Sequence, residues 1–191
     1  MRISGGQLKG RKISVKGFLA KKNDSKDLRP TSAKVREAIF NILQKEINGA
    51  DFLDLYAGTG AVGIEAISRG AKRVSFTDNN HSCTKKIKEY LLKFGLADLA
   101  NVYSEKADDF IKRSSLSGIR FDIIFADPPY ASDEIMKIVQ MIAENDLLSE
   151  GGCFLAEHSS KLTLPEHSGA LSCLKKYKYG DTMLSLYRRD K

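Results

Sequence analysis

Hydrophobic and polar residues repeat with two different periods along the chain from residue 51 onward. Short apolar runs alternate with longer segments in which apolar residues recur every three or four positions, which predicts strands and helices in turn. The run FDIIFA at 121–126 is almost wholly apolar, as expected of a strand buried on both faces. The expected strands are 52–56, 73–77, 101–104, 121–126, 153–157, 171–179 and 183–188, and the expected helices are 61–69, 82–94, 107–113 and 133–144. Strands separated by helices favour parallel βαβ units, so we predict an α/β fold with a mostly parallel sheet and helices on both faces.

Residues 1–50 follow a different pattern. Alternating segments at 1–7 and 11–15, separated by glycines, predict a small β-hairpin, and the polar segment 18–27 is typical of a loop. Apolar residues then recur at helical spacing from Val35 to Ile47, which predicts a helix with Thr31 or Ser32 as its N-cap. We therefore divide the chain into an N-terminal hairpin and loop extension, residues 1–28, and a main domain, residues 29–191.

The net charge of +7 is concentrated in the N-terminal part of the chain. Residues 1–50 contain 12 Lys and Arg against 4 Asp and Glu, a balance of +8, whereas residues 51–191 contain 19 against 20, a balance of −1. A basic segment attached to a near-neutral body indicates a polyanionic partner, usually nucleic acid. A solvated basic surface without a partner is the alternative interpretation of the same composition.

Cysteine, histidine and hydropathy patterns argue against several other classes of protein. The three cysteines are odd in number and far apart, and the three histidines have no metal-binding spacing, so we expect neither a disulfide framework nor a metal site. No apolar run reaches the roughly 18 residues of a membrane span, and the first residues, MRISGGQLKG, lack the apolar core of a signal peptide. We therefore expect a cytoplasmic protein that does not associate with a membrane.

The segment DLYAGTGAVG places Gly58, Gly60 and Gly63 in G-x-G-x-x-G spacing between an expected strand and an expected helix. Glycines in this position let a ligand approach the backbone closely. Asp78 ends the following strand, where an acid accepts hydrogen bonds from a ribose diol. Dinucleotides and S-adenosylmethionine both use such an arrangement. Asp54, four residues before Gly58, favours the second ligand because a carboxylate attracts the amino group of a methionine moiety and repels a pyrophosphate.

The segment DPPY, residues 127–130, follows the apolar run at 121–126 directly. It therefore lies at the carboxyl edge of the expected sheet, where open α/β sheets bind ligands. An exocyclic amine on a nucleobase is a poor nucleophile because its lone pair is delocalised into the ring. The Asp127 carboxylate and the Pro128 carbonyl can accept hydrogen bonds from both N–H groups, while Pro129 stiffens the turn and Tyr130 offers a face for base stacking. A solvated proline-rich turn is the alternative interpretation.

Both segments resemble motifs of a known enzyme class. DLYAGTGAVGIEAISRGA resembles motif I of class I S-adenosylmethionine-dependent methyltransferases, and DPPY resembles motif IV of methyltransferases that act on adenine N6, guanine N2 or glutamine. The blocks MRISGGQLKGRKI, LRPTSAKVREAIFNIL, FADPPY and YGDTMLSLYRR, together with the motif I segment, occur in the order seen in the bacterial 16S rRNA guanine-N2 methyltransferase family. The resemblance therefore covers nearly the whole chain.

This resemblance implies a Rossmann-like sheet of seven strands preceded by an N-terminal β-hairpin that helps to hold rRNA. It implies that S-adenosyl-L-methionine donates a methyl group to the N2 amine of one guanine in small-subunit rRNA. Naked rRNA and an assembled small subunit both stay open as substrates, and we expect a monomer.

The resemblance also implies which residues form the sites. The expected cofactor residues are Asp54, Tyr56, Ala57, Gly58, Thr59, Gly60, Asp78 and Asn79, and the expected catalytic residues are Asp127, Pro128, Pro129 and Tyr130. Many relatives carry an acid or amide facing adenine where this chain has Lys106, so the Ala107 backbone or Asp108 is expected to contact adenine instead. The expected RNA contacts are Arg2, Lys9, Arg11 and Lys12 in the hairpin and Arg29, Thr31 and Arg36 near the start of the first helix. Independently of the resemblance, Glu157 ends an expected strand near the presumed site. We expect it to be a surface acid, and a supporting role behind the active site is the alternative interpretation.

Three other functions are compatible with parts of the sequence. A DNA adenine-N6 methyltransferase would share the DPPY chemistry but usually needs a separate target-recognition domain, for which 191 residues leave little room. A non-catalytic RNA-binding protein on this scaffold would not require Asp127. An NAD-dependent oxidoreductase would use the same glycines but leaves Asp54 and DPPY unexplained.

Overall fold

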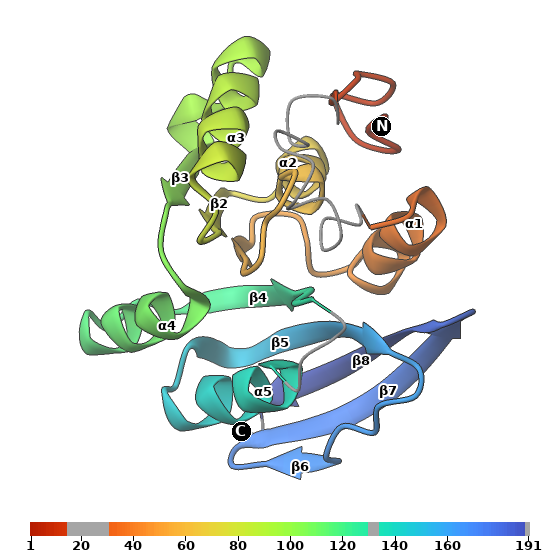
Figure 1. The fold of residues 1–191 in the computed structure, drawn as a ribbon, viewed down its shortest axis with the longest axis vertical. Coiled ribbons are helices and arrows are strands. Elements are labelled where there is room, and N and C mark those ends of the chain that lie inside the picture. Colours follow the sequence, from red (N-terminus) through yellow and green to blue (C-terminus); the bar gives the residue numbers. More distant parts are fainter. Residues whose placement is uncertain (15–30, 130–133, 190–191) are drawn as a thin grey trace.

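The computed structural model describes residues 1–14, 31–129 and 134–189. An eight-stranded sheet runs through the middle of the fold (Figure 1). Its strands are β1 (Asp51–Asp54), β2 (Arg73–Thr77), β3 (Ala100–Tyr103), β4 (Phe121–Ala126), β5 (Leu148–Ser159), β6 (His167–Ser168), β7 (Leu171–Tyr179) and β8 (Thr182–Arg189). They lie in the order β3-β2-β1-β4-β5-β8-β7-β6. Strands β1 to β5 pair in parallel, whereas β8 pairs antiparallel with both β5 and β7.

The α/β class and the antiparallel C-terminal edge are confirmed, and the described sheet has one strand more than expected. The additional strand is β6, which pairs with the first two residues of β7. A tight turn at Gly169, where φ is 54°, folds the two residues of β6 back onto β7. So short a strand has too few residues to show an alternating pattern in the sequence.

Helices cover both faces of the sheet (Figure 1). They are α1 (Ala33–Ile42), α2 (Ala61–Ser68), α3 (His81–Phe94), α4 (Ala107–Leu116) and α5 (Glu134–Glu144), with a 3-10 turn at Ala97–Leu99 between α3 and β3. Successive strand residues point to opposite faces, so Phe52 of β1 joins a core with α1, α2 and α3, whereas Leu53 joins a core with α4 and α5. The same alternation in β4 and β5 divides the apolar run 121–126 between the two cores.

Helix α1 begins where the sequence indicated and ends earlier. The Ser32 side chain accepts a hydrogen bond from the Val35 backbone N–H at 3.2 Å, which makes Ser32 rather than Thr31 the N-cap. The helix ends at Ile42, although apolar residues continue at helical spacing to Ile47. Leu43 and Ile47 are still buried, because the turn after α1 packs on the same core as the helix.

The N-terminal segment forms a minimal hairpin seated on α2 and α3. Its two arms meet at one antiparallel bridge between Arg2 and Lys12, and Ile3 and Ile13 are buried beneath it. The Gln7 backbone N–H donates to the Ser68 carbonyl of α2 at 2.8 Å. The Tyr90 hydroxyl of α3 accepts from the Ser14 backbone N–H, also at 2.8 Å. The expected hairpin is therefore confirmed, and its backbone is fixed to α2, which follows the glycine segment, and to α3, which follows β2.

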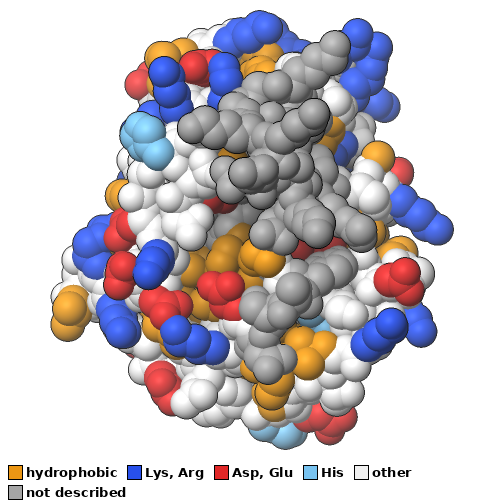
Figure 2. Space-filling model, in the orientation of Figure 1, with side chains coloured by type: hydrophobic (Ala, Val, Ile, Leu, Met, Phe, Trp, Pro, Cys, Tyr) orange, Lys and Arg blue, Asp and Glu red, His pale blue; other side chains and the backbone are white. Residues whose placement is uncertain are grey.

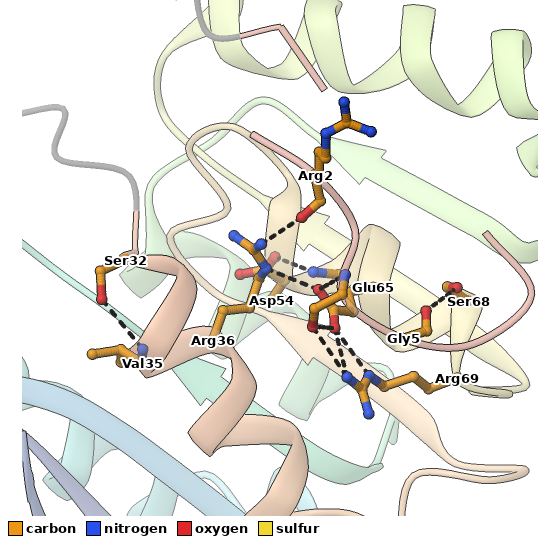
Figure 3. Close-up of polar contacts among 11 residues, drawn as sticks. Arg2, Gly5, Ser32, Val35, Arg36, Asp54, Glu65, Ser68 and Arg69 are labelled. Carbon is orange, nitrogen blue, oxygen red and sulfur yellow. Dashed lines mark hydrogen bonds and ion pairs between the residues drawn. The ribbon is translucent and has the colours of Figure 1, made fainter. Parts of the chain in front are cut away.

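A buried ion-pair cluster joins the hairpin to α1 and α2 (Figure 3). Glu65 of α2 is fully buried and accepts from Arg36 Nε at 2.8 Å and from Arg69 Nη2 at 2.8 Å. The Ser4 backbone N–H of the hairpin donates to the same carboxylate, and Arg36 Nη2 donates to the Arg2 carbonyl at 2.6 Å. The Glu65 carboxylate is therefore compensated by two guanidinium groups, as a buried charge requires, whereas Arg36 Nη1 is buried without a hydrogen-bond partner among the described residues.

Within the described ranges, no helix has the length and apolar character needed to cross a membrane.

Candidate active site

Three carboxylates come together at the carboxyl ends of neighbouring strands. Asp54 is the last residue of β1, Asp78 follows β2, and Asp127 follows β4. Because β1 lies between β2 and β4 in a parallel arrangement, the three strands end at the same edge of the sheet. This is the edge at which open α/β sheets bind ligands.

The glycine segment turns the chain from β1 into α2 directly above this edge. Gly60 is the N-cap of α2 with a φ of 72°, and a Cβ at that position would lie 2.7 Å from Cγ1 of Ile87. Tyr56 also has a positive φ, 143°, which is strained for a residue with a side chain. Its hydroxyl donates to Glu134 Oε1 at 2.8 Å, a contact that joins the segment after β1 to the start of α5. Ala57 and Thr59 are buried within the turn.

Asp54 is a buried carboxylate, with 2% of its surface exposed, whose charge is poorly compensated. Its Oδ2 accepts a hydrogen bond from the Gly63 backbone N–H in the first turn of α2 at 2.9 Å. Burial raises the pKa of Asp54 to about 7 in spite of this bond, and the charges of Asp78 and Asp127 contribute to the increase. A cationic ligand at this position would relieve the repulsion, whereas a pyrophosphate would increase it. The donor set therefore fits the amino and sulfonium groups of S-adenosylmethionine.

Backbone N–H groups donate hydrogen bonds to both carboxylate oxygens of Asp78. Oδ2 accepts from the Gly58 N–H at 2.7 Å, and Oδ1 accepts from the Asn80 N–H at 2.8 Å. Partial burial raises the pKa of Asp78. The adjacent Asn79 is exposed. This arrangement ties the acid after β2 to the glycine segment, so a ribose bound by Asp78 would also lie beside the Gly58 backbone.

The start of α4 lies at the same edge, after β3. Lys106 is the N-cap of α4 without a side-chain capping bond, and Ala107 is buried. The Asp108 carboxylate forms an ion pair with Lys137 of α5. Since the Asp108 carboxylate is already paired with Lys137, the Ala107 backbone is the better placed of the two expected adenine contacts.

Asp127 lies between two groups that neither the motif nor its spacing indicates. The Thr31 hydroxyl, just before α1, donates to Asp127 Oδ2 at 3.3 Å. Glu157 of β5 is the second neighbour. Burial raises the pKa of Asp127 strongly, and the charge of Glu157 raises it further. Pro128 is buried and Pro129 is exposed, while Tyr130 lies outside the described residues. Glu157 is 3% exposed, so the expectation of a surface acid was wrong.

The expected RNA contacts divide into exposed, buried and undescribed residues. Arg2, Lys9, Arg11 and Lys12 are exposed on the hairpin, and Figure 2 shows basic side chains gathered at the top of the molecule, where the hairpin and α3 lie. Arg36 is only 2% exposed and is bound to Glu65 and to the Arg2 carbonyl. A phosphate has no access to a guanidinium in this position, so the prediction that Arg36 contacts RNA was wrong. Arg29 lies outside the described residues.

Comparison with known proteins gives the relationship of the chain to a family. Residues 1–188 match the model of a family described as Conserved hypothetical protein 95. The chain belongs to this family.

Proteins and solved structures that are similar to this chain match it over almost its whole length. YlbH of Bacillus subtilis (strain 168) is 34% identical over 189 residues, which cover 99% of both chains. Ribosomal RNA small subunit methyltransferase D of Escherichia coli (strain K12) is 31% identical over 192 residues, covering 100% of this chain and 90% of that protein. The solved structure of yhhF from Escherichia coli has a TM-score of 0.81 at 29% identity, covering 100% of this chain and 98% of the other. The resemblance to the rRNA methyltransferase family is thereby confirmed over the hairpin, the glycine segment and the strand before Asp127.

Proposed function

We propose that the protein transfers a methyl group from S-adenosyl-L-methionine to the exocyclic N2 amine of a guanine in small-subunit 16S rRNA. One observation carries this proposal: the Asp127 carboxylate stands at the carboxyl end of β4, beside the strand that leads into the glycine segment. The E. coli relative, which is named a ribosomal RNA small subunit methyltransferase, supports rRNA as the substrate.

The residues at the sheet edge have separate tasks in holding the cofactor. When bound, S-adenosylmethionine supplies an activated methyl group on a sulfonium. The buried Asp54 carboxylate attracts its positive charge, and Asp78 accepts hydrogen bonds from the ribose while holding the Gly58 N–H on Oδ2. The Ala107 backbone at the start of α4 lies toward the adenine end.

Asp127 and the Pro128 carbonyl act on the target amine. Each accepts a hydrogen bond from one N–H of the amine, which favours a pyramidal nitrogen with its lone pair directed away from the ring. Asp127 accepts such a bond most strongly as a carboxylate, because hydrogen bonds to a charged acceptor are stronger than neutral ones. The protein then contributes mainly by holding the amine in line for reaction. Tyr130 would stack on the base and complete the DPPY group.

The exposed cations of the hairpin hold the rRNA backbone. Arg2, Lys9, Arg11 and Lys12 lie on a segment fixed to α2 and α3, so they can position phosphates relative to the sheet edge. Residues 1–28 thus form an RNA-binding extension of the methyltransferase domain, residues 29–191. We propose that a monomer acts in the cytoplasm, on rRNA that is either naked or part of an assembled small subunit.

Replacement of Asp127 by Asn tests the proposed function. Asp127→Asn should lower methyl transfer to rRNA by about 100-fold or more, because preorganised charged groups contribute on this scale. S-adenosylmethionine should still bind with an affinity within about tenfold of the wild type, since Asp127 accepts from the substrate amine. Asp98→Asn, at an exposed carboxylate in the 3-10 turn, is the matched control and should retain full activity. Wild-type turnover by Asp127→Asn would rule out the role given to Asp127.

A further inference from the structure

Asp127 and Glu157 occupy equivalent positions on two adjacent parallel strands. Ala126 of β4 pairs with Ala156 of β5, so the next residue of each strand stands beside the other. Phe125 and Leu155, two residues earlier on each strand, both point into the core that contains α1. By the alternation of strand side chains, Asp127 and Glu157 therefore point to the same face of the sheet as α1.

Thr31 approaches Asp127 from that same face. It lies in the segment that leads into α1, and its hydroxyl donates to Asp127 Oδ2 at 3.3 Å. Two contacts fix the start of this helix: the Ser32 cap on Val35, and the buried ion pair between Arg36 and Glu65. Thr31 directly precedes the N-cap of this helix and is partly buried.

We propose that Thr31 and Glu157 are positioning residues for Asp127, and that they shift in opposite directions the pH range in which Asp127 acts as a carboxylate. The proposal rests on the proposed function, because it assumes that Asp127 accepts hydrogen bonds from the substrate amine. It assigns Thr31 a role inside the active site in place of the expected phosphate contact.

The two neighbours have opposite electrostatic effects. A hydroxyl that donates to Asp127 stabilises the ionised form, whereas a second buried carboxylate beside it disfavours that form. Burial and then Glu157 raise the pKa of Asp127, and the bond from Thr31 lowers it.

Two further charged groups among the described residues belong to elements packed near Asp127. From β1, Asp54 faces Asp127 as a third acid, and the charge of Asp127 contributes to the raised pKa of Asp54. From α1, Arg36 is directed to Glu65 instead. Of these described groups, Thr31 stabilises the Asp127 carboxylate, whereas Glu157 on β5 and Asp54 on β1 both oppose it.

The pH dependence of kcat/KM for rRNA, measured with S-adenosylmethionine kept saturating at every pH, tests the proposal. Its acid limb then reports ionisation in the enzyme–cofactor complex before rRNA binds, and saturation removes the contribution of Asp54 to cofactor binding. Thr31→Val keeps the shape of the side chain and removes the hydroxyl, so the acid limb should move to higher pH by about one unit. Glu157→Gln keeps the size and removes the charge, so the acid limb should move to lower pH by about one unit. Thr31→Ser restores the hydroxyl and should return the limb to its wild-type position.

Opposite shifts in the two variants would support the proposal, since loss of packing or partial unfolding would not move the limb in opposite directions. Shifts in the same direction, or no shift in either variant, would overturn it. Circular dichroism and calorimetric affinity for S-adenosylmethionine establish that each variant is folded. If Asp127→Asn loses turnover while Thr31→Val and Glu157→Gln leave the profile unmoved, this inference fails and the proposed function stands. If Asp127→Asn keeps wild-type turnover, the proposed role of Asp127 fails first.

Discussion

Arg36 and Glu65 form an ion pair in the interior of the protein, with Arg36 Nε 2.8 Å from Glu65 Oε2 and both side chains at most 2% exposed. The pair connects α1 to α2, and the same carboxylate accepts the Ser4 backbone N–H of the hairpin. One buried acid therefore joins three parts: the helix that carries Thr31 to Asp127, the helix that follows the glycine segment, and the hairpin expected to bind RNA.

Glu65→Gln should destabilise the protein by about 3–5 kcal/mol, because removal of one partner leaves the Arg36 guanidinium buried without a counter-charge. Urea unfolding measures this change in the free energy of unfolding. Glu89→Gln is the matched control, since Glu89 pairs with Lys86 on the exposed surface of α3 and should contribute little. Equal effects of the two substitutions would contradict the structural role of Glu65.

Asp54 predicts a conflict between stability and cofactor binding. Its folded pKa of about 7 lies above the ordinary value of 3.8, so ionisation of Asp54 costs stability in the folded protein. This cost is absent below about pH 4, grows as the pH rises, and is complete above about pH 7. Asp54→Asn should therefore stabilise the cofactor-free protein at about pH 8, by an amount on the order of 4 kcal/mol at most, and much less at about pH 4.

The same substitution should weaken binding of S-adenosylmethionine. Below about pH 7 the free protein holds a proton on Asp54 that the cationic ligand must displace, so wild-type affinity should fall up to tenfold for each pH unit. Asp54→Asn should bind weakly and without this slope. Titration calorimetry across the range measures both quantities. A wild-type affinity that is independent of pH, or an Asp54→Asn variant that binds as well as the wild type at pH 8, would remove Asp54 from the cofactor site.

The basic hairpin predicts a change in the salt dependence of RNA binding. The double variant Lys9→Gln and Lys12→Gln should lower the slope of log K against log salt by about 1–2, because each phosphate contact contributes roughly 0.7–0.9. Lys72 and Lys112 are exposed on other parts of the molecule, and their replacement by Gln is the control with the same loss of charge. An unchanged slope in the hairpin variant would show that these lysines do not contact phosphates.

Strands and helices with a clear period were predictable from the sequence. The predicted strands 73–77 and 121–126 are β2 and β4 with the same bounds, because polar residues, glycine or proline mark their ends. In contrast, β5 starts at Leu148 rather than at 153. Gly151 and Gly152 interrupt the apolar pattern in the sequence, but pairing with the neighbouring strand overrides this local signal.

The motifs of the site were visible in the sequence, whereas its long-range contacts were not. Asp54 lies within the predicted strand 52–56, and Asp78 and Asp127 each directly follow a predicted strand. The rule for parallel sheets places the ends of these strands at one edge. Arg36 was predicted to contact RNA because it is a cation near the start of the first helix. Its partner Glu65 is 29 residues away, and only the packing of α1 on α2 brings the two together. Likewise, the register of β4 against β5 buries Glu157 beside Asp127, and residue spacing carries no signal for that register.

The most direct measurement of the central claim is methyl transfer from labelled S-adenosylmethionine, with the product nucleoside identified by mass spectrometry. Unmodified small-subunit rRNA, assembled small subunits and duplex DNA are offered separately, and Asp127→Asn serves as the inactive control. We expect N2-methylguanosine from rRNA or from subunits, and no product from DNA. N6-methyladenine from DNA would contradict it, because the DPPY chemistry would then act on a different base and the hairpin would not be an rRNA-binding element.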